Sequence, residues 1–273
     1  MSLNDAPHIE TYGMLAKLPA PVCAVIDALE NEGYEAWVVG GFVRDALRGV
    51  APHDADIATN APWQETCRAC ASRGMAVHET GTTHGTVTVV CENEPIEVTT
   101  FRTEGTYTDH RHPDSVLFVD TIEEDLARRD FTINAMAFHP VRGLVDPFDG
   151  MYDLEECIIR TPCDPDITFS DDPLRMMRAV RFASQLGFTI EEETFDAIRR
   201  NAPRIGIVSR ERIAAELNKI VLSPVPSIGF ELLEATGLLE RIFPELHNLK
   251  GVEKRGAHAH KDNFVHTLKV LDN

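Results

Sequence analysis

The hydrophobic pattern changes near residue 150, and this change constrains the fold more than any other feature of the sequence. Before it, short apolar runs alternate with glycine turns and with segments of helical spacing, which together predict a mixed α/β layer. After it, glycine becomes rarer and apolar residues recur at helical spacing. The sequence therefore predicts an α+β head, in which helices flank a mixed β-sheet, followed by an all-α part.

The expected elements follow from local periodicity and turn residues. Helical spacing predicts helices over residues 21–31, 42–49, 62–72, 121–129, 173–186, 192–200, 208–221 and 227–236. Apolar or alternating runs predict strands over 36–39, 55–58, 75–78, 86–91, 96–101, 133–138 and 144–146. The chain stops within a helical pattern, and we interpret it as a piece of a longer protein.

Composition narrows the class of protein. Of 273 residues, 43% are hydrophobic and 26% are charged, a globular balance that argues against disorder. No apolar run approaches the ~20 residues that a membrane helix needs, and the polar N-terminus does not resemble a signal peptide. We therefore expect a cytoplasmic enzyme or binding protein with no membrane partner.

The net charge is −18, from 26 Lys and Arg against 44 Asp and Glu. Taken alone, this charge argues against nucleic acid as a partner, because phosphate neutralisation needs a basic surface. The acidic excess falls within the first 200 residues. A polyanion would therefore have to meet local arginine clusters or the C-terminal part, and the acidic front half suits a site for metal cations.

The six cysteines are too sparse for a disulfide scaffold, so we expect reduced thiols. Cys67 and Cys70 form a CxxC pair. No second pair follows that would complete a zinc site, and we do not expect zinc there.

A double glycine, Gly40-Gly41, lies where a predicted strand turns into a helix. Glycine lets the backbone approach a ligand, and the N–H groups at a helix start favour phosphate. Arg44 would lie one helical turn further on and could reach the same phosphate. By itself, a double glycine before a helix is usually an ordinary turn.

Three acidic residues predict a metal site. Asp54 and Asp56 are i and i+2 neighbours, so on a strand both carboxylates project from one face and repel each other unless a cation lies between them. Mg²⁺ favours one or two carboxylates together with substrate phosphates. If the strand of Glu97 pairs beside that of Asp56, three carboxylates converge as in two-metal phosphoryl transfer. Each acid alone is also compatible with a solvated surface position, whereas their order and spacing together are more specific.

Longer motifs cover most of the chain from about residue 20 onward. They are GGFVRD (40–45), DAD (54–56), HGTVTVV (84–90), EVTTFR (97–102), EEDLARRDFTINAMA (123–137), DPFDG (146–150), DDPLRMMRAVRFA (171–183) and SRERIAAEL (209–217). With these motifs the chain resembles the class II branch of the tRNA nucleotidyltransferase and bacterial poly(A) polymerase family. The head of that family is a nucleotidyltransferase palm of the polymerase β-like type.

The resemblance implies roles for residues of the head. Asp54 and Asp56 match the metal-binding pair, which implies Mg²⁺ as the cofactor, and Glu97 matches the third catalytic acid. The nucleotide-contacting positions of the glycine turn correspond to Gly41 and Arg44, and the arginine that contacts the incoming triphosphate corresponds to Arg129.

The resemblance also implies that Asp172 and Arg175 face the Watson–Crick edge of CTP or ATP. Asp accepts from the exocyclic amine that C and A share, and Arg donates to a ring nitrogen or carbonyl. The family usually has Glu where this chain has Asp171, which affects only the support of the pair. On sequence alone, Asp172 before Pro173 favours a helix N-cap, and only the resemblance favours base reading.

Arg178 and Arg181 continue at steps of three from Arg175, so from Asp172 to Arg181 the series rotates half way round a straight helix and cannot all face one base. We assign both to phosphate or acid partners, with a structural arginine ladder as the alternative. The polar segment 103–115, with Arg111 and His112, corresponds to the family's flexible loop. The stretch with His258, His260 and His266 resembles the start of an HD-type domain but lacks the downstream His-Asp pair, so we predict no complete metal site there.

The expected function is template-independent addition of C and A to the tRNA 3′ end, from CTP and ATP. The implied domains are a catalytic head over 1–150, a base-selecting neck over 151–222 and a truncated helical body over 223–273. Alternatives are a poly(A) polymerase, an enzyme adding only CC or only A, and a non-catalytic RNA-binding protein on the same fold. The sequence leaves the oligomeric state open.

Overall fold

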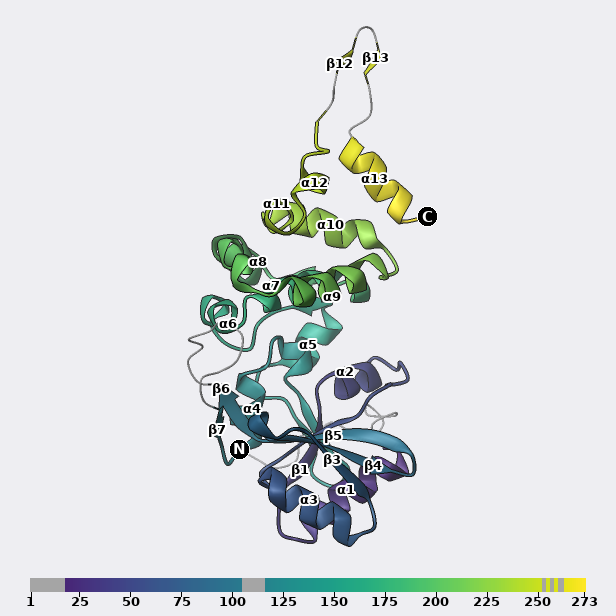
Figure 1. Ribbon diagram of the computed structural model, residues 1–273, viewed down its shortest axis with the longest axis vertical. Coiled ribbons are helices and arrows are strands. Elements are labelled where there is room, and N and C mark those ends of the chain that lie inside the picture. The colour runs from purple at the N-terminus through teal and green to yellow at the C-terminus, as the bar shows by residue number, and fades with distance from the viewer. Residues whose placement is uncertain (1–17, 105–115, 252–253, 256–257, 260–262) are drawn as a thin grey trace. The chain divides into compact units, whose positions relative to one another are not determined.

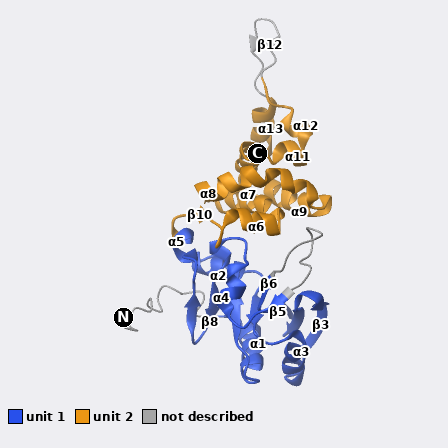
Figure 2. Cartoon of the chain, turned by 90° about the vertical axis from the view of Figure 1, so that its left-hand side faces the viewer, with its two compact units in different colours: residues 1–105, 115–154 blue, residues 106–114, 155–273 orange. Residues whose placement is uncertain are grey.

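The computed structural model describes residues 18–104, 116–251, 254–255, 258–259 and 263–273 (Figure 1). The chain divides into two compact units (Figure 2). The first holds residues 1–105 and 115–154, and the second holds 106–114 and 155–273. Among the described helices, none is long and apolar enough to cross a membrane.

A seven-stranded mixed sheet organises the first unit. In sheet order its strands are β3 (Ala76–Gly81), β4 (Thr86–Cys91), β5 (Glu94–Thr100), β2 (Asp56–Thr59), β1 (Ala36–Val39), β8 (Ala137–His139) and β9 (Gly143–Val145). The pairing of β2 with β5 is parallel, and the other pairings are antiparallel. This arrangement places the end of β1 beside the start of β2, and the start of β2 beside Glu97 of β5.

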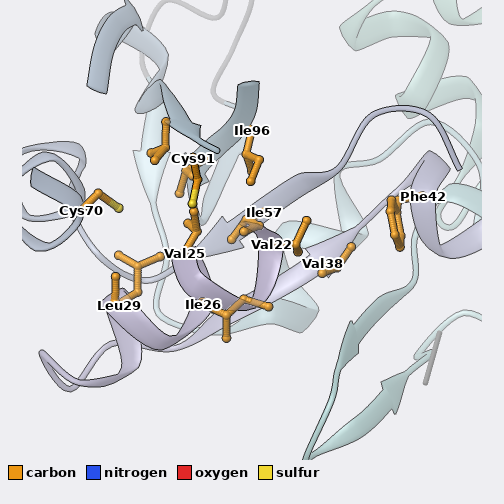
Figure 3. Packing of buried hydrophobic residues seen from close by; sticks show 14 of the residues in the cluster. Val22, Val25, Ile26, Leu29, Val38, Phe42, Ile57, Cys70, Cys91 and Ile96 are labelled. Atoms are coloured by element: carbon orange, nitrogen blue, oxygen red, sulfur yellow. The ribbon is translucent and has the colours of Figure 1, made fainter. Parts of the chain in front are cut away.

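One face of the sheet is covered by α1 (Ala20–Glu30) and α3 (Trp63–Ser72), which Figure 1 shows on the same side of the strands. Residues of α1 pack against Val38, Ile57 and Ile96 in one buried cluster (Figure 3). Strand alternation explains the cluster, because every second residue of β1, β2 and β5 points to this face. Burial of these aliphatic side chains stabilises the sheet by ~1.5–3 kcal/mol for each large residue.

The opposite face carries Trp37, Val39 and Ala58, which pack with Ile122 and Leu126 of α4 (Ile122–Ala127). Toward β3 and β4, threonines take the place of apolar residues. The hydroxyls of Thr80 and Thr88 lie 2.9 Å apart, and those of Thr86 and Thr99 lie 3.0 Å apart. The half of this face next to β5 is therefore polar.

Helices dominate the second unit, as the sequence predicts. They are α6 (Pro165–Asp171), α7 (Leu174–Leu186), α8 (Glu192–Asn201), α9 (Arg210–Val221), α10 (Pro226–Ala235), α11 (Leu239–Ile242), α12 (Pro244–His247) and α13 (Asn263–Leu271). The central helix α7 buries most of its residues. At Gly229 of α10, an added Cβ would lie 2.4 Å from a methyl carbon of Ile220, so glycine allows α9 and α10 to approach closely.

The remaining short elements are α2 (Gly41–Leu47), α5 (Gly150–Glu155), the 3₁₀ turns over Thr82–His84, Thr132–Asn134 and Ala202–Ile207, and the strand pairs β6 (Arg102–Glu104) with β7 (Val116–Phe118), β10 (Ile158–Ile159) with β11 (Thr189–Ile190), and β12 (Lys254–Arg255) with β13 (His258–Ala259).

The α+β head and the helical second part confirm the predicted fold class. The strand expected over 133–138 is wrong in its first half, where Thr132–Asn134 form a 3₁₀ turn and β8 begins only at Ala137. The sequence analysis also missed α5 and α6. Residues 105–115 of the expected loop lie outside the described residues.

Candidate active site

The glycine turn connects β1 to α2. Gly40 has φ 73° and ψ −134°, a backbone conformation that disfavours residues with a Cβ. A Cβ added there would also lie 3.1 Å from a terminal nitrogen of Arg129. Two reasons therefore favour glycine at this position: the backbone conformation of the turn, and the space that the Arg129 guanidinium occupies beside it.

Arg44 is held on both sides of its guanidinium. Its Nε and Nη2 donate to the two carboxylate oxygens of Asp45 at 2.9 and 2.8 Å, and its Nη1 donates to Oδ1 of Asn134 at 2.7 Å. Asn134 in turn donates to Oδ1 of Asp130 at 3.1 Å. The side chain of Arg44 is thus fixed next to the glycine turn.

The structure confirms the strand pairing on which the acidic site depends. β2 and β5 run parallel with Asp56 directly opposite Glu97, so both side chains emerge on the same face. Asp54 precedes β2, which starts at Asp56, so strand alternation does not place it. Asp56 and Glu97 are therefore neighbours on the polar half of the sheet, and the carboxylates of Glu97 and Asp54 both raise the pKa of Asp56.

The pKa of Asp56 is raised from its ordinary value of 3.8 to about 6. Surrounding protein, which withholds water from the charged form, contributes most, although the residue keeps exposed surface. Repulsion from Glu97 comes next, the positive charge of Arg129 opposes it, and Asp54 adds a smaller repulsion. Such a carboxylate gains from a nearby cation.

Arg129 reaches this site from the segment after α4. Its Nη2 donates to Oδ2 of Asp125 at 3.0 Å, while the guanidinium lies beside Gly40 and lowers the pKa of Asp56. A positive charge therefore stands between the glycine turn and the acids. Asp125 was not among the residues singled out from the sequence, although its spacing of four residues before Arg129 is a recognisable signal.

The acidic group suits a hard divalent cation. Carboxylate oxygens are the ligands that Mg²⁺ prefers, and it commonly takes only one or two of them, completing its shell with water and substrate phosphates. The sequence analysis expected three carboxylates to converge on a metal, but among the described residues no group of three or more His, Cys, Asp or Glu side chains could hold a metal ion. The donors present fit a cation shared with a phosphate ligand.

In the second unit, both oxygens of Asp172 are engaged. Oδ1 accepts from the backbone N–H of Leu174 at 3.1 Å, and Oδ2 accepts from Arg212 at 2.7 Å. The first contact is the capping interaction that the sequence offered as an alternative. Arg212 lies within the SRERIAAEL motif, but the sequence analysis gave it no role.

The arginines of α7 have different surroundings. Arg175 is 8% exposed. Arg181 pairs with the buried Glu216, with Nε 2.7 Å from Oε2, and lies over the ring of Phe182. Arg178 lies over the same ring at 5.6 Å. Arg181 thus has an acid partner, one of the two kinds expected.

Within the first unit, the structure brings together Asp54, Asp56, Glu97, Arg129 and the glycine turn with Arg44. Asp172, Arg175, Arg178 and Arg181 gather in the second unit around the start and middle of α7. Arg111, His112 and His260 lie outside the described residues.

Two family models match the chain. Residues 36–160 match a model described as the poly(A) polymerase head domain, and residues 187–250 match one described as a probable RNA- and SrmB-binding site of polymerase A. The CCA-adding enzyme of Geobacillus kaustophilus is 48% identical over 214 residues, which cover 78% of this chain and 52% of that enzyme. The CCA-adding enzyme of Lactobacillus johnsonii is 44% identical over 242 residues, which cover 89% of this chain and 58% of that enzyme.

Solved structures agree with these relatives. The CCA-adding enzyme of Bacillus stearothermophilus, solved in complex with CTP, matches with a TM-score of 0.73 and 40% identity, over 81% of this chain and 53% of that one. The Thermotoga maritima CCA-adding enzyme complexed with tRNA matches with a TM-score of 0.69 and 27% identity, and the match covers 86% of this chain and 56% of that one. The chain spans about half the length of the relatives it matches. The fold, the motifs and these relatives together show that the chain belongs to the tRNA nucleotidyltransferase and bacterial poly(A) polymerase family.

Proposed function

We propose that this chain carries the catalytic head and base-selecting region of a CCA-adding enzyme, which extends the tRNA 3′ end with C and A from CTP and ATP. The observation that supports it best is the parallel pairing of Asp56 with Glu97 beside Arg129 and the glycine turn. Relatives whose names state CCA addition support the same activity.

In the proposed reaction the RNA 3′ hydroxyl attacks the α-phosphorus of the nucleotide. A phosphodiester bond forms, the bond to the β-phosphate breaks, and pyrophosphate leaves. Asp54 and Asp56 would hold Mg²⁺, which when bound supplies activation of the attacking oxygen and charge neutralisation at the leaving group. Glu97 orients the hydroxyl or accepts its proton.

The triphosphate would lie along the glycine turn. Gly41 gives the backbone close access, Arg44 is fixed next to the turn, and Arg129 carries a positive charge to the same place. These contacts involve only phosphates, so they serve CTP and ATP equally. Base choice is assigned elsewhere in the chain.

Base selection is assigned to Asp172 and Arg175. A carboxylate accepts from the exocyclic amine that C and A carry and that U and G lack at the corresponding place, and Arg donates to a ring acceptor. Arg178 acts on a phosphate or supports this pair. Arg181 pairs with Glu216, an acid partner of the kind expected for it.

The test is a product-length assay on tRNA that ends at the discriminator base, with CTP alone, ATP alone, both, or UTP and GTP. We expect two added residues with CTP and three with CTP and ATP together. Asp56→Asn should abolish incorporation while leaving the tryptophan fluorescence of the folded protein unchanged. Incorporation of labelled CTP by that variant would refute the assignment of the catalytic acids.

The same assay separates the alternatives. A poly(A) polymerase makes long products from ATP alone, and a CC-adding or A-adding enzyme stops after its own nucleotide. A non-catalytic RNA-binding protein makes none. Metal-dependent thermal stabilisation by CTP and ATP, but not by UTP and GTP, independently distinguishes an enzyme from such a protein.

A further inference from the structure

Asp125 is completely buried, and its carboxylate is surrounded by donors. Oδ1 accepts from the backbone N–H of Arg102 at 3.2 Å and from Nε and Nη2 of Arg128 at 3.0 and 2.9 Å. Oδ2 accepts from Nη2 of Arg129 at 3.0 Å. Each oxygen thus serves a different arginine.

The two arginines meet this carboxylate differently. Arg128 donates to Oδ1 from two nitrogens of its guanidinium, whereas Arg129 donates to Oδ2 from one nitrogen. Another terminal nitrogen of Arg129 is the atom that would lie 3.1 Å from a Cβ at Gly40. One end of the Arg129 guanidinium is therefore anchored, and the other is presented at the glycine turn.

The two arginines also determine the charge state of Asp125. Burial alone would raise the pKa of Asp125, but the positive charges of Arg129 and Arg128 hold it below its ordinary value. The carboxylate stays ionised at neutral pH and keeps holding Arg129.

We infer that Asp125 is a positioning residue, which fixes the guanidinium of Arg129 at the glycine turn for the triphosphate of the incoming nucleotide. This inference rests on the proposed function, in which Arg129 contacts that triphosphate. Asp125 itself is enclosed and touches no substrate. It acts through orientation, because an arginine held in place loses less rotamer freedom when the nucleotide binds.

Asp125→Asn keeps the shape and one accepting oxygen but removes the charge that holds Arg129. A charge-assisted hydrogen bond contributes enough that we expect roughly a tenfold rise in KM for both CTP and ATP, with kcat changed less than threefold. Arg128→Gln is the matched control, because it removes a partner of the same carboxylate at the other oxygen. It should leave both KM values within about twofold.

A merely structural Asp125 gives a different pattern. Both variants would then lower the unfolding temperature and the active fraction while KM stays constant. Tryptophan fluorescence monitors the fold, and inhibition by tripolyphosphate, the part common to both nucleotides, should weaken in Asp125→Asn in step with KM. Unchanged KM and unchanged tripolyphosphate inhibition would overturn the inference.

Arg129→Ala separates this inference from the proposed function. If Arg129→Ala raises KM and Asp125→Asn adds nothing in that background, the two residues act as one unit. If only Arg129→Ala raises KM, the positioning role fails while the proposed function stands. If Arg129→Ala leaves KM unchanged, the triphosphate role of Arg129 fails. Asp125→Glu, which keeps the charge, replaces Asp125→Asn if the latter does not fold, and a failure of both to fold also counts against a positioning role.

Discussion

Removing the charge of Asp56 should stabilise the folded protein, because the ionised carboxylate is less stable in the folded state than in the unfolded chain. The pKa of Asp56 rises to about 6 on folding through shielding from water, repulsion from Glu97 and a smaller repulsion from Asp54, against an opposing effect of Arg129. Between pH 3.8 and about 6 the folded state therefore holds more protons at Asp56 than the unfolded chain does. The free energy of unfolding falls as the pH rises through this window and stays lower above it.

The size of the effect follows from the same values. A rise from 3.8 to about 6 corresponds to ~3 kcal/mol at full strength. Asp56 keeps exposed surface, so solvent and salt screen its interactions and we expect about 1 kcal/mol. Asp56→Asn should accordingly raise the free energy of unfolding by about 1 kcal/mol at pH 8 and by almost nothing at pH 4.

Urea unfolding followed by tryptophan fluorescence measures this gain in the correct unit, since both tryptophans, Trp37 and Trp63, lie in the first unit. Glu97→Gln removes the larger of the two repulsions and should recover part of the same gain, so the double variant should fall short of the sum. A gain that is equal at pH 4 and pH 8, or a loss at pH 8, would refute the reasoning.

Three further outcomes are expected. At limiting Mg²⁺, nucleotide incorporation should fall as the pH drops through about 6, since Asp56 must be ionised to hold a cation, and more Mg²⁺ should move the inflection to lower pH; an inflection near 4 would contradict this. Gly40→Ala should raise the KM for both nucleotides and cost about 1–2 kcal/mol, whereas Gly33→Ala, at φ 88° with open space around it, should cost stability in urea unfolding but leave KM unchanged. Glu216→Gln should lower the free energy of unfolding by about 3 kcal/mol, because it leaves the buried Arg181 without the acid it pairs with. Urea unfolding followed by far-ultraviolet circular dichroism measures this loss, and a loss below about 0.5 kcal/mol would show that the pair is not a structural support.

The strands that carry Asp56 and Glu97 were predictable because apolar runs and turn residues agreed there. The run over Ala36–Val39 is continuously apolar, and it forms β1 with these bounds, buried throughout. The strand after the Glu92–Pro95 turn was expected to begin near Ile96, and β5 already begins at Glu94. Its pairing with β2 was stated as a condition, since sequence periodicity fixes which face a residue takes but not which strand lies beside it.

The turn over Thr132–Asn134 could not be read from periodicity. Apolar residues alternate through Ile133, Ala135 and Ala137, which is the pattern of a strand. Hydrogen bonds decide otherwise, because Asp130 accepts from the side chain of Asn134, and Thr132 donates to the buried Asp153. The contact between Thr132 and Asp153 joins residues 21 apart, which the local pattern does not contain.

The missed helix α6 had a local signal. Asp164 precedes Pro165 at its start, and the Asp164 carboxylate accepts from the backbone N–H groups of Asp166 and Ile167. An acidic cap with proline at the first helical position is a helix start, and the same signal was recognised at Asp172 and Pro173. Asp172 and Pro173 lie between α6 and α7, and the sequence analysis recognised only the start of α7.

Asp172 shows why a cap and a base-reading residue are not exclusive. A carboxylate offers about four acceptor positions, and the described contacts use one on each oxygen, for the N–H of Leu174 and for Arg212. Acceptor capacity therefore remains for an exocyclic amine. The cap holds one oxygen at the start of α7 and Arg212 holds the other, so the carboxylate is already oriented before a base arrives. If Asp172 reads a base as proposed, the contacts at the start of α7 also set the direction of its remaining acceptor positions.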